Sequence, residues 1–129
     1  QNTSAPFTGH GVIPGAASPI YRRLNLETKN GAAKYWGDVN DREEPHGQGV
    51  TKWQANHHEY SGLYENGIMH GTGAYYIPAE EGLYELDFVD GNPCGIGTLT
   101  EGSGRSTLFY EVDFDGKGSF HAGVQPTKK

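Results

Sequence analysis

The feature that most constrains the fold of this chain is a pattern that recurs with a period of 24 residues. The clearest copy covers residues 60–73 and combines aromatic residues with an Asn-Gly pair and a His-Gly pair. A shift of 24 positions in either direction reaches further copies, at Tyr84, Leu86, Phe88, Gly91, Cys94, Gly95 and Gly97, and at His46, Gly47 and Gly49. A fixed period of this length indicates an array of one small unit. Arrays of this kind offer extended binding surfaces, so we expect a surface and not a catalytic pocket.

The composition favours short strands joined by tight turns. The 129 residues include 20 glycines and 12% aromatic residues, although only 34% are hydrophobic. Disordered chains are poor in aromatic residues, so the low hydrophobic content does not indicate disorder. Aromatic residues favour strands and glycine favours turns, which predicts one domain rich in β-hairpins.

The formal net charge of −6 argues against nucleic acid as a partner, because that affinity depends on Lys and Arg neutralising phosphates. The same charge opposes electrostatic adhesion to an anionic membrane. The clusters of basic residues, Arg22-Arg23 and Lys128-Lys129, are short. The sequence has no run of about 18 apolar residues, so we expect no transmembrane segment.

Cysteine usage bears on the compartment. Cys94 is the only cysteine, so no internal disulfide can form and an oxidising compartment is not indicated. We therefore expect an intracellular protein. Because the sequence begins at Gln1 and not at Met, an organelle reached after removal of a targeting peptide is one alternative.

Proline, glycine and the repeat divide the chain into three parts. Residues 1–33 contain three prolines and are predicted to form an irregular N-terminal extension that caps the array, with a possible edge strand at residues 21–27. Residues 123–129 are predicted to be a disordered tail. The array between them has units at about residues 34–54, 59–77, 83–100 and 108–121.

Each unit is predicted to contain two strands joined by a turn with glycine, and the last unit has a short second strand at residues 119–121. Side chains along a strand alternate between two faces. One face of the first strands is acidic, and the other face carries Tyr35, Gly37, Val39, Tyr60, Gly62, Tyr64, Tyr84, Leu86, Phe88, Tyr110, Val112 and Phe114. The pattern predicts an all-β fold: a single-layer antiparallel sheet of consecutive β-hairpins with an irregular N-terminal cap.

One stretch resembles a MORN repeat (membrane occupation and recognition nexus): Tyr60-x-Gly62-x-Tyr64-x-Asn66-Gly67-x-x-His70-Gly71-x-Gly73-x-Tyr75. Unit one keeps the His46-Gly47 pair, and unit three has Cys94 where the histidine is expected. The resemblance covers about residues 34–122. It implies a MORN-type repeat array, an elongated and twisted sheet of hairpins. It also implies a role in holding proteins together in a membrane- or cytoskeleton-associated assembly.

The glycines of the repeat have physical roles. Glycine at the start of a second strand permits positive φ and a close approach of backbones. Gly62 leaves a gap between Tyr60 and Tyr64 into which a neighbouring ring can pack. The predicted turn and structural positions are Gly47, Gly49, Gly71, Gly73, Gly95 and Gly97.

The candidate catalytic and metal-binding residues have simpler explanations. His46 and His70 lie one repeat apart, about 10 Å in a stacked array, and zinc requires its ligands much closer together. They are interpreted as turn histidines bonded to local backbone. Asp-Gly pairs are typical of hairpin turns and lack the further oxygen ligands of a calcium loop, and Cys94 is interpreted as a turn residue and not a nucleophile. We predict no enzyme activity, no metal and no cofactor.

The aromatic face is the strongest candidate for function. Left uncovered, it would exceed the few hundred Å² of apolar surface that soluble monomers usually expose. Two alternatives stay open: residues 1–33 and the curl of the sheet cover it, or a helix or extended segment of a protein partner or a second copy of the chain does. The predicted partner-binding residues are Tyr35, Trp53, Tyr60, Tyr64, Tyr75, Tyr84, Phe88, Tyr110 and Phe114.

The expected function is therefore non-catalytic protein–protein interaction, as a small scaffold or accessory subunit of a larger assembly. Tyr, Trp and Phe dominate the energetics of many interfaces, which favours this reading. The resemblance supplies an alternative, a peripheral membrane contact through phospholipid headgroups.

Overall fold

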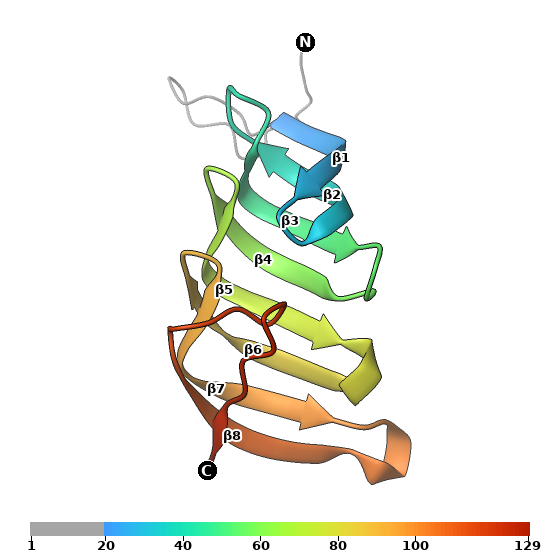
Figure 1. The fold of residues 1–129 in the computed structure, drawn as a ribbon, viewed down its shortest axis with the longest axis vertical. Helices are drawn as coiled ribbons and strands as arrows, with labels where there is room; N and C mark the ends of the chain where they lie inside the picture. Colours follow the sequence, from blue (N-terminus) through green and yellow to red (C-terminus); the bar gives the residue numbers. More distant parts are fainter. Residues whose placement is uncertain (1–19) are drawn as a thin grey trace, which may run out of the picture.

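The computed structural model describes residues 20–129, which form one open antiparallel sheet (Figure 1). Each strand pairs with the next along the chain, so the predicted all-β fold of consecutive hairpins is confirmed. Within this range, no helix has the length and apolar character needed to span a membrane. The elements are β1 (Ile20–Thr28), β2 (Gly31–Val39), β3 (Pro45–Trp53), β4 (Glu59–Glu65), β5 (Ile68–Ile77), η1 (Pro78–Glu80), β6 (Gly82–Val89), β7 (Asn92–Glu101), η2 (Gly104–Ser106), β8 (Leu108–Asp115) and β9 (Thr127–Lys128).

Two of the hairpin turns have the geometry that their sequences predict. Asn66 and Gly67, between β4 and β5, have φ values of 46° and 88°. Asp90 and Gly91, between β6 and β7, have φ values of 51° and 86°. Two consecutive positive φ values match the twist of the flanking strands, and Asn-Gly and Asp-Gly adopt them at low cost.

Hydrogen bonds between successive turns follow the repeat. The backbone N–H of Gly67 donates to the oxygen of Pro45 at 2.7 Å. At positions 24 residues later, the N–H of Gly91 donates to the oxygen of Met69 at 2.9 Å. The same bond in two successive units ties neighbouring hairpins together outside the sheet ladder.

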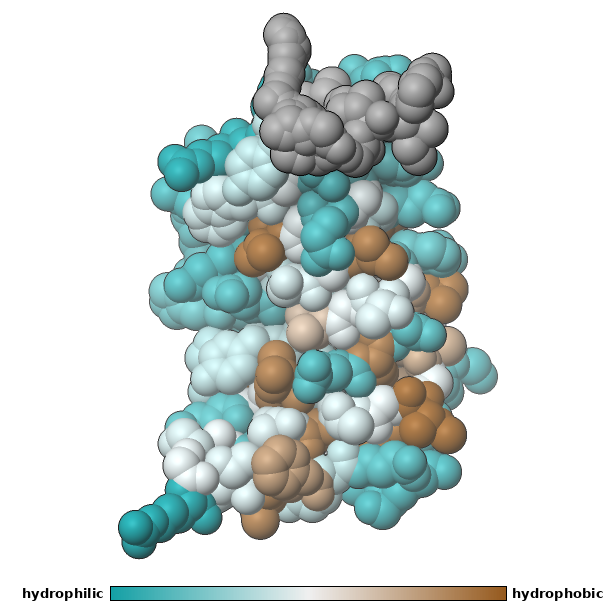
Figure 2. Space-filling view, turned by 180° about the vertical axis from the view of Figure 1, so that it is seen from behind, coloured by the Kyte–Doolittle hydropathy of each residue, from teal (hydrophilic) through white to brown (hydrophobic). Residues whose placement is uncertain are grey.

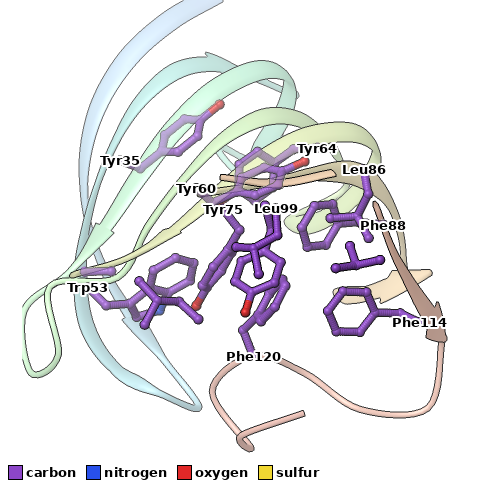
Figure 3. Packing of buried hydrophobic residues seen from close by; sticks show 14 of the residues in the cluster. Tyr35, Trp53, Tyr60, Tyr64, Tyr75, Leu86, Phe88, Leu99, Phe114 and Phe120 are labelled. Carbon is purple, nitrogen blue, oxygen red and sulfur yellow. The ribbon is translucent and has the colours of Figure 1, made fainter. Parts of the chain in front are cut away.

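The two faces of the sheet differ as the alternation predicts. In β4, Tyr60 and Tyr64 are buried, whereas Ser61 and Leu63 between them are exposed. The strands curve around the buried rings, so the inner face is concave (Figure 3). On the outer face, hydrophobic residues are interspersed with hydrophilic ones (Figure 2). Among the exposed hydrophobic residues, Ile96 is 61% exposed, and single residues of this kind are common on soluble proteins.

The N-terminal boundary of the array differs from the prediction. The edge strand expected at residues 21–27 is confirmed as β1. Residues 20–33 are not irregular, because β1 pairs with β2 along its whole length, from Ile20 opposite Val39 to Thr28 opposite Gly31. Leu24 and Leu26 pack against the core from this strand. Side chains two residues apart point to the same face of a strand, so both leucines lie on the inner face. Residues 1–19, the rest of the predicted cap, lie outside the described residues.

The C-terminal end also differs. Residues 119–121 form no second strand, because Ala122 and Gly123 donate backbone hydrogen bonds back to Ser119 and Phe120 and close a turn. Residues 123–129, predicted as a disordered tail, include β9, which pairs with β8. We call residues 116–124 the C-terminal strap. The strap crosses the concave side of the sheet and places Phe120 against the rings (Figures 1 and 3).

Candidate functional site: the concave groove

The inner face is built around tyrosines that lie over glycines. The ring of Tyr60 packs over Gly73 and its hydroxyl lies close to Gly62, the cross-strand partner of Gly73. The Tyr60 hydroxyl donates to the backbone oxygen of Leu63 at 2.6 Å. A Cβ at Gly73 would lie 2.5 Å from the nearest ring carbon of Tyr60. The prediction that a neighbouring ring fills this gap was wrong, because the ring belongs to Tyr60 itself.

Unit one repeats this arrangement. Tyr35 lies over Gly49, where a Cβ would be 2.3 Å from the ring. Burial raises the pKa of the Tyr35 hydroxyl to about 12, and the nearby Asp38 adds to the effect. The glycines that follow the turns in three units all have positive φ: Gly47 (97°), Gly71 (92°) and Gly95 (86°).

Unit three departs from the pattern. Leu86 occupies the position that corresponds to Gly62, so the inner face has less room for a tyrosine ring there. The hydroxyl of Tyr84 instead donates to Oε1 of Glu80 at 3.0 Å. Gly97 keeps a structural role, because a Cβ there would lie 2.3 Å from the Cβ of Leu86.

The predicted partner-binding residues lie mainly in the core. Tyr110 is half-buried, with Nζ of Lys128 4.3 Å from its ring centroid. Little of the other eight side chains is exposed in this conformation, although Trp53 and Tyr64 line the groove described below. Exposures of 0–7% are found for these eight, Tyr35, Trp53, Tyr60, Tyr64, Tyr75, Tyr84, Phe88 and Phe114.

The strap supplies part of this cover. The Phe120 ring stacks on Tyr75 with a centroid distance of 4.4 Å, and it lies 4.7 Å from Tyr84 and 5.3 Å from Phe114. His121 packs edge-on against Trp53 at 4.5 Å. Sequence reasoning missed Phe120 and His121 as parts of the concave face, because the pattern of the earlier units is lost in the shortened fourth unit where both lie. The available signal was a single aromatic residue inside a glycine-rich segment.

A groove remains on the concave face between the strap and the turn that joins β1 to β2. Its volume is about 510 Å³, and its inner wall includes Trp53, Tyr64 and Met69. Thr51, a buried polar residue in the same wall, forms a hydrogen bond with the hydroxyl of Tyr64. The full lining is Leu26, Glu27, Thr28, Lys29, Asn30, Glu43, Glu44, Pro45, Thr51, Trp53, Tyr64, Gly67, Ile68, Met69, Asp90, Gly91, Asn92, Ser119 and His121.

Acidic residues predominate among the charged groups of the groove. The four acidic lining residues stand against one basic residue, Lys29. Two of the four form surface ion pairs, Glu43 with Arg22 at 3.3 Å and Glu44 with Arg42 at 3.4 Å. The other two, Glu27 and Asp90, have no ion pair within residues 20–129. The groove therefore presents an apolar interior with an acidic rim.

The histidines fall into two groups. His46, in β3, accepts a hydrogen bond at 3.0 Å from the backbone N–H of Asn66 in the next hairpin, so its partner is not the local backbone that the sequence predicted. His58 and His121 are partly buried and lie with their rings tilted and their centroids 5.2 Å apart, and His58 Nδ1 lies 2.9 Å from the Tyr75 hydroxyl. Within the part of the chain that the structure describes, no three His, Cys, Asp or Glu residues cluster in a way that suits a metal ion.

Lowering the pH is expected to destabilise the fold through His121. Burial, with smaller contributions from His58 and Lys29, lowers its pKa from 6.5 to about 4. In the unfolded chain the imidazole takes up its proton near pH 6.5, whereas in the folded chain it does so only near pH 4. The stabilising contribution is therefore complete above pH 6.5 and is lost as the pH falls through 4.

Urea unfolding between pH 7.5 and 4 tests this expectation. The free energy of unfolding of wild type should fall more steeply than that of a His121→Gln variant. His57→Gln, in an exposed turn position, serves as the control and should follow wild type. Parallel pH curves for wild type and His121→Gln would contradict the assignment.

Comparisons with known proteins agree with a repeat array of β-hairpins. No protein-family model matches the chain. Alsin from Mus musculus and alsin from Homo sapiens are each 38% identical over 66 residues, which is 48% of this chain and 4% of alsin. The chain thus matches a small part of a much longer protein. Alsin contains MORN repeats, and its similarity to this chain agrees with the repeated hairpins of the sheet.

Proposed function

We propose that this protein is a non-catalytic protein–protein interaction module, a MORN-type scaffold or accessory subunit that holds a segment of a partner in the concave groove. The observation that supports this proposal most directly is the groove. The strap and the curl of the sheet cover most of the rings, but a hollow of about 510 Å³ beside Trp53, Tyr64 and Met69 stays open among residues 20–129. A concave site with an apolar lining and a few polar groups is the usual form of a binding site.

The charges of the groove indicate which partner segments would be favoured. Glu27 and Asp90 leave negative charge at the rim, and the net charge of the whole chain is −6. Complementary charges speed the encounter of two proteins and select against wrong partners. A segment with an apolar side chain between Lys or Arg residues therefore suits the site best.

Site-specific photo-crosslinking tests the proposal. A photoreactive phenylalanine analogue replaces Met69 in the groove or, in a matched control, Ile96 on the outer face, which is 61% exposed. Each variant is irradiated in an extract of the cells that express the protein. We expect a protein adduct of defined mass at position 69, at least tenfold more abundant than any adduct at position 96. Adducts formed only at position 96 would place the binding surface on the outer face and contradict the proposal.

Co-sedimentation with phospholipid vesicles tests the lipid alternative. Binding of anionic headgroups requires positive charge at the site, and the groove has an excess of acidic residues. We expect no co-sedimentation with vesicles that contain anionic phospholipid, at low or moderate salt. Salt-sensitive co-sedimentation would favour a peripheral membrane role over the protein partner.

A further inference from the structure

The strap occupies part of the concave face in the manner of a bound peptide. Phe120 is 5% exposed and lies among the rings of Tyr75, Tyr84, Phe88 and Phe114 (Figure 3). Aromatic pairs favour stacked and edge-to-face contacts of this kind, which stabilise beyond the burial of their area. The strap therefore fills a site that is shaped for an aromatic anchor.

Side chains, and not a strand ladder, hold the strap in place. The backbone hydrogen bonds of residues 119–124 close turns within the strap itself. Within the described residues, residues 117–124 form no backbone hydrogen bond with a sheet strand, and pairing resumes only at β9. Gly116 and Gly123 have φ values of 82° and 84°, which glycine adopts readily. The strap is thus joined to the sheet by segments that can change direction.

The strap and the open groove belong to one continuous surface. Ser119 and His121 line the groove on one side, while Phe120 between them is inserted among the core rings. A segment bound in the groove would therefore lie directly against the strap. Removal of the strap would extend the groove over the rings that Phe120 now covers.

We propose that the strap is an intramolecular ligand, and that a partner segment with an aromatic anchor competes with it for the site of Phe120. This inference rests on the proposed function, because it assumes that the concave face receives a partner segment. The strap supplies the chemistry of that segment: an aromatic side chain between small or polar neighbours, in a chain that turns at glycine. Binding of the partner is weakened by the fraction of molecules in which the strap is closed.

A peptide copy of the strap tests the competition. The probe is a synthetic peptide of residues 115–126, Asp-Gly-Lys-Gly-Ser-Phe-His-Ala-Gly-Val-Gln-Pro. It is titrated into the full-length wild-type chain and into a Phe120→Ala variant. We expect at least tenfold tighter binding to the variant, because its own strap no longer fills the site. A peptide in which alanine replaces the phenylalanine should not bind either chain.

Two results would overturn the inference. One is a Phe120→Ala chain that keeps its near-ultraviolet circular dichroism and does not bind the peptide. The other comes from hydrogen exchange in wild type, which needs no variant. The amides of Ala122, Gly123 and Val124 are hydrogen-bonded within the strap, and they should exchange at least tenfold faster than those of Tyr75 and Tyr84. Equal rates would show that the strap opens only when the whole domain unfolds.

The two proposals fail in different ways. A protein adduct at Met69 together with a peptide that does not bind the folded variant would leave the groove as a binding site and reject the exchange of the strap. Peptide binding without any adduct at Met69 would support a displaceable strap and remove the evidence for a partner in the open groove.

Discussion

A Gly73→Ala substitution is expected to lower the free energy of unfolding by about 3 kcal/mol, near the upper end of the usual cost of overpacking a core. The new Cβ would lie 2.5 Å from a ring carbon and 2.6 Å from the hydroxyl oxygen of Tyr60. The ring cannot move away freely, because its hydroxyl donates a hydrogen bond to the backbone oxygen of Leu63 and the ring packs edge-on against Tyr64 and Phe88. Urea unfolding followed by circular dichroism measures the loss.

A matched control and a double variant identify the cause of this loss. Gly118→Ala should change stability by less than about 0.5 kcal/mol, since a Cβ there meets its nearest neighbour at an ordinary 3.4 Å. In a Tyr60→Ala background, the cost of Gly73→Ala should largely disappear, because the three nearest atoms to the new Cβ all belong to Tyr60. Additive costs in this double-mutant cycle would show that the glycine is needed for another reason.

Tyr75→Ala is expected to destabilise the protein by about 4 kcal/mol, within the range for truncation of a buried aromatic residue. Tyr75 is 0% exposed. Its ring stacks on Phe120 at 4.4 Å and lies 6.0 Å from Trp53, and its hydroxyl pairs with His58 at 2.9 Å. The truncation would leave a cavity between the sheet and the strap.

The next residue in β5 provides the control. Tyr76 points to the outer face and is 38% exposed, so Tyr76→Ala should cost about 1 kcal/mol or less. The two variants lose the same atoms from adjacent positions, and thermal or urea unfolding compares them directly. Similar losses from both would contradict the assignment of an inner and an outer face.

Burial of the tyrosines changes how the aromatic face can be tested. A Tyr60→Ala, Tyr84→Ala variant would remove two side chains that are 0% and 2% exposed, so a loss of partner binding could arise from unfolding alone. Substitutions at the exposed rim of the groove avoid this problem, whereas Phe120 is 5% exposed and its variant needs circular dichroism as a check on the fold. The buried aromatic residues affect binding through the shape of the concave face. Partner binding itself is tested by substitutions at the exposed rim and at Phe120.

Much of the sheet followed from local patterns in the sequence. The period of 24 residues, the alternation of side chains and the Asn-Gly and Asp-Gly turns each depend on residues close together in the chain, so each could be recognised without coordinates. The same holds for the need for glycine at Gly71 and Gly95, whose φ values are positive. The separation of an aromatic inner face from an outer face of mixed character followed from the period of two along each strand.

The strap and the groove could be found only from the tertiary structure. Phe120 and His121 lie in the shortened fourth unit, where the pattern of the earlier units is lost, so no repeat marked them as residues that pack on the concave face. Their partners Tyr75, Tyr84 and Trp53 lie 36 or more residues earlier in the chain, and contacts over such separations leave no periodic trace in a single sequence. The curl of the sheet brings these residues together, and so it decides which rings are buried and where a groove stays open.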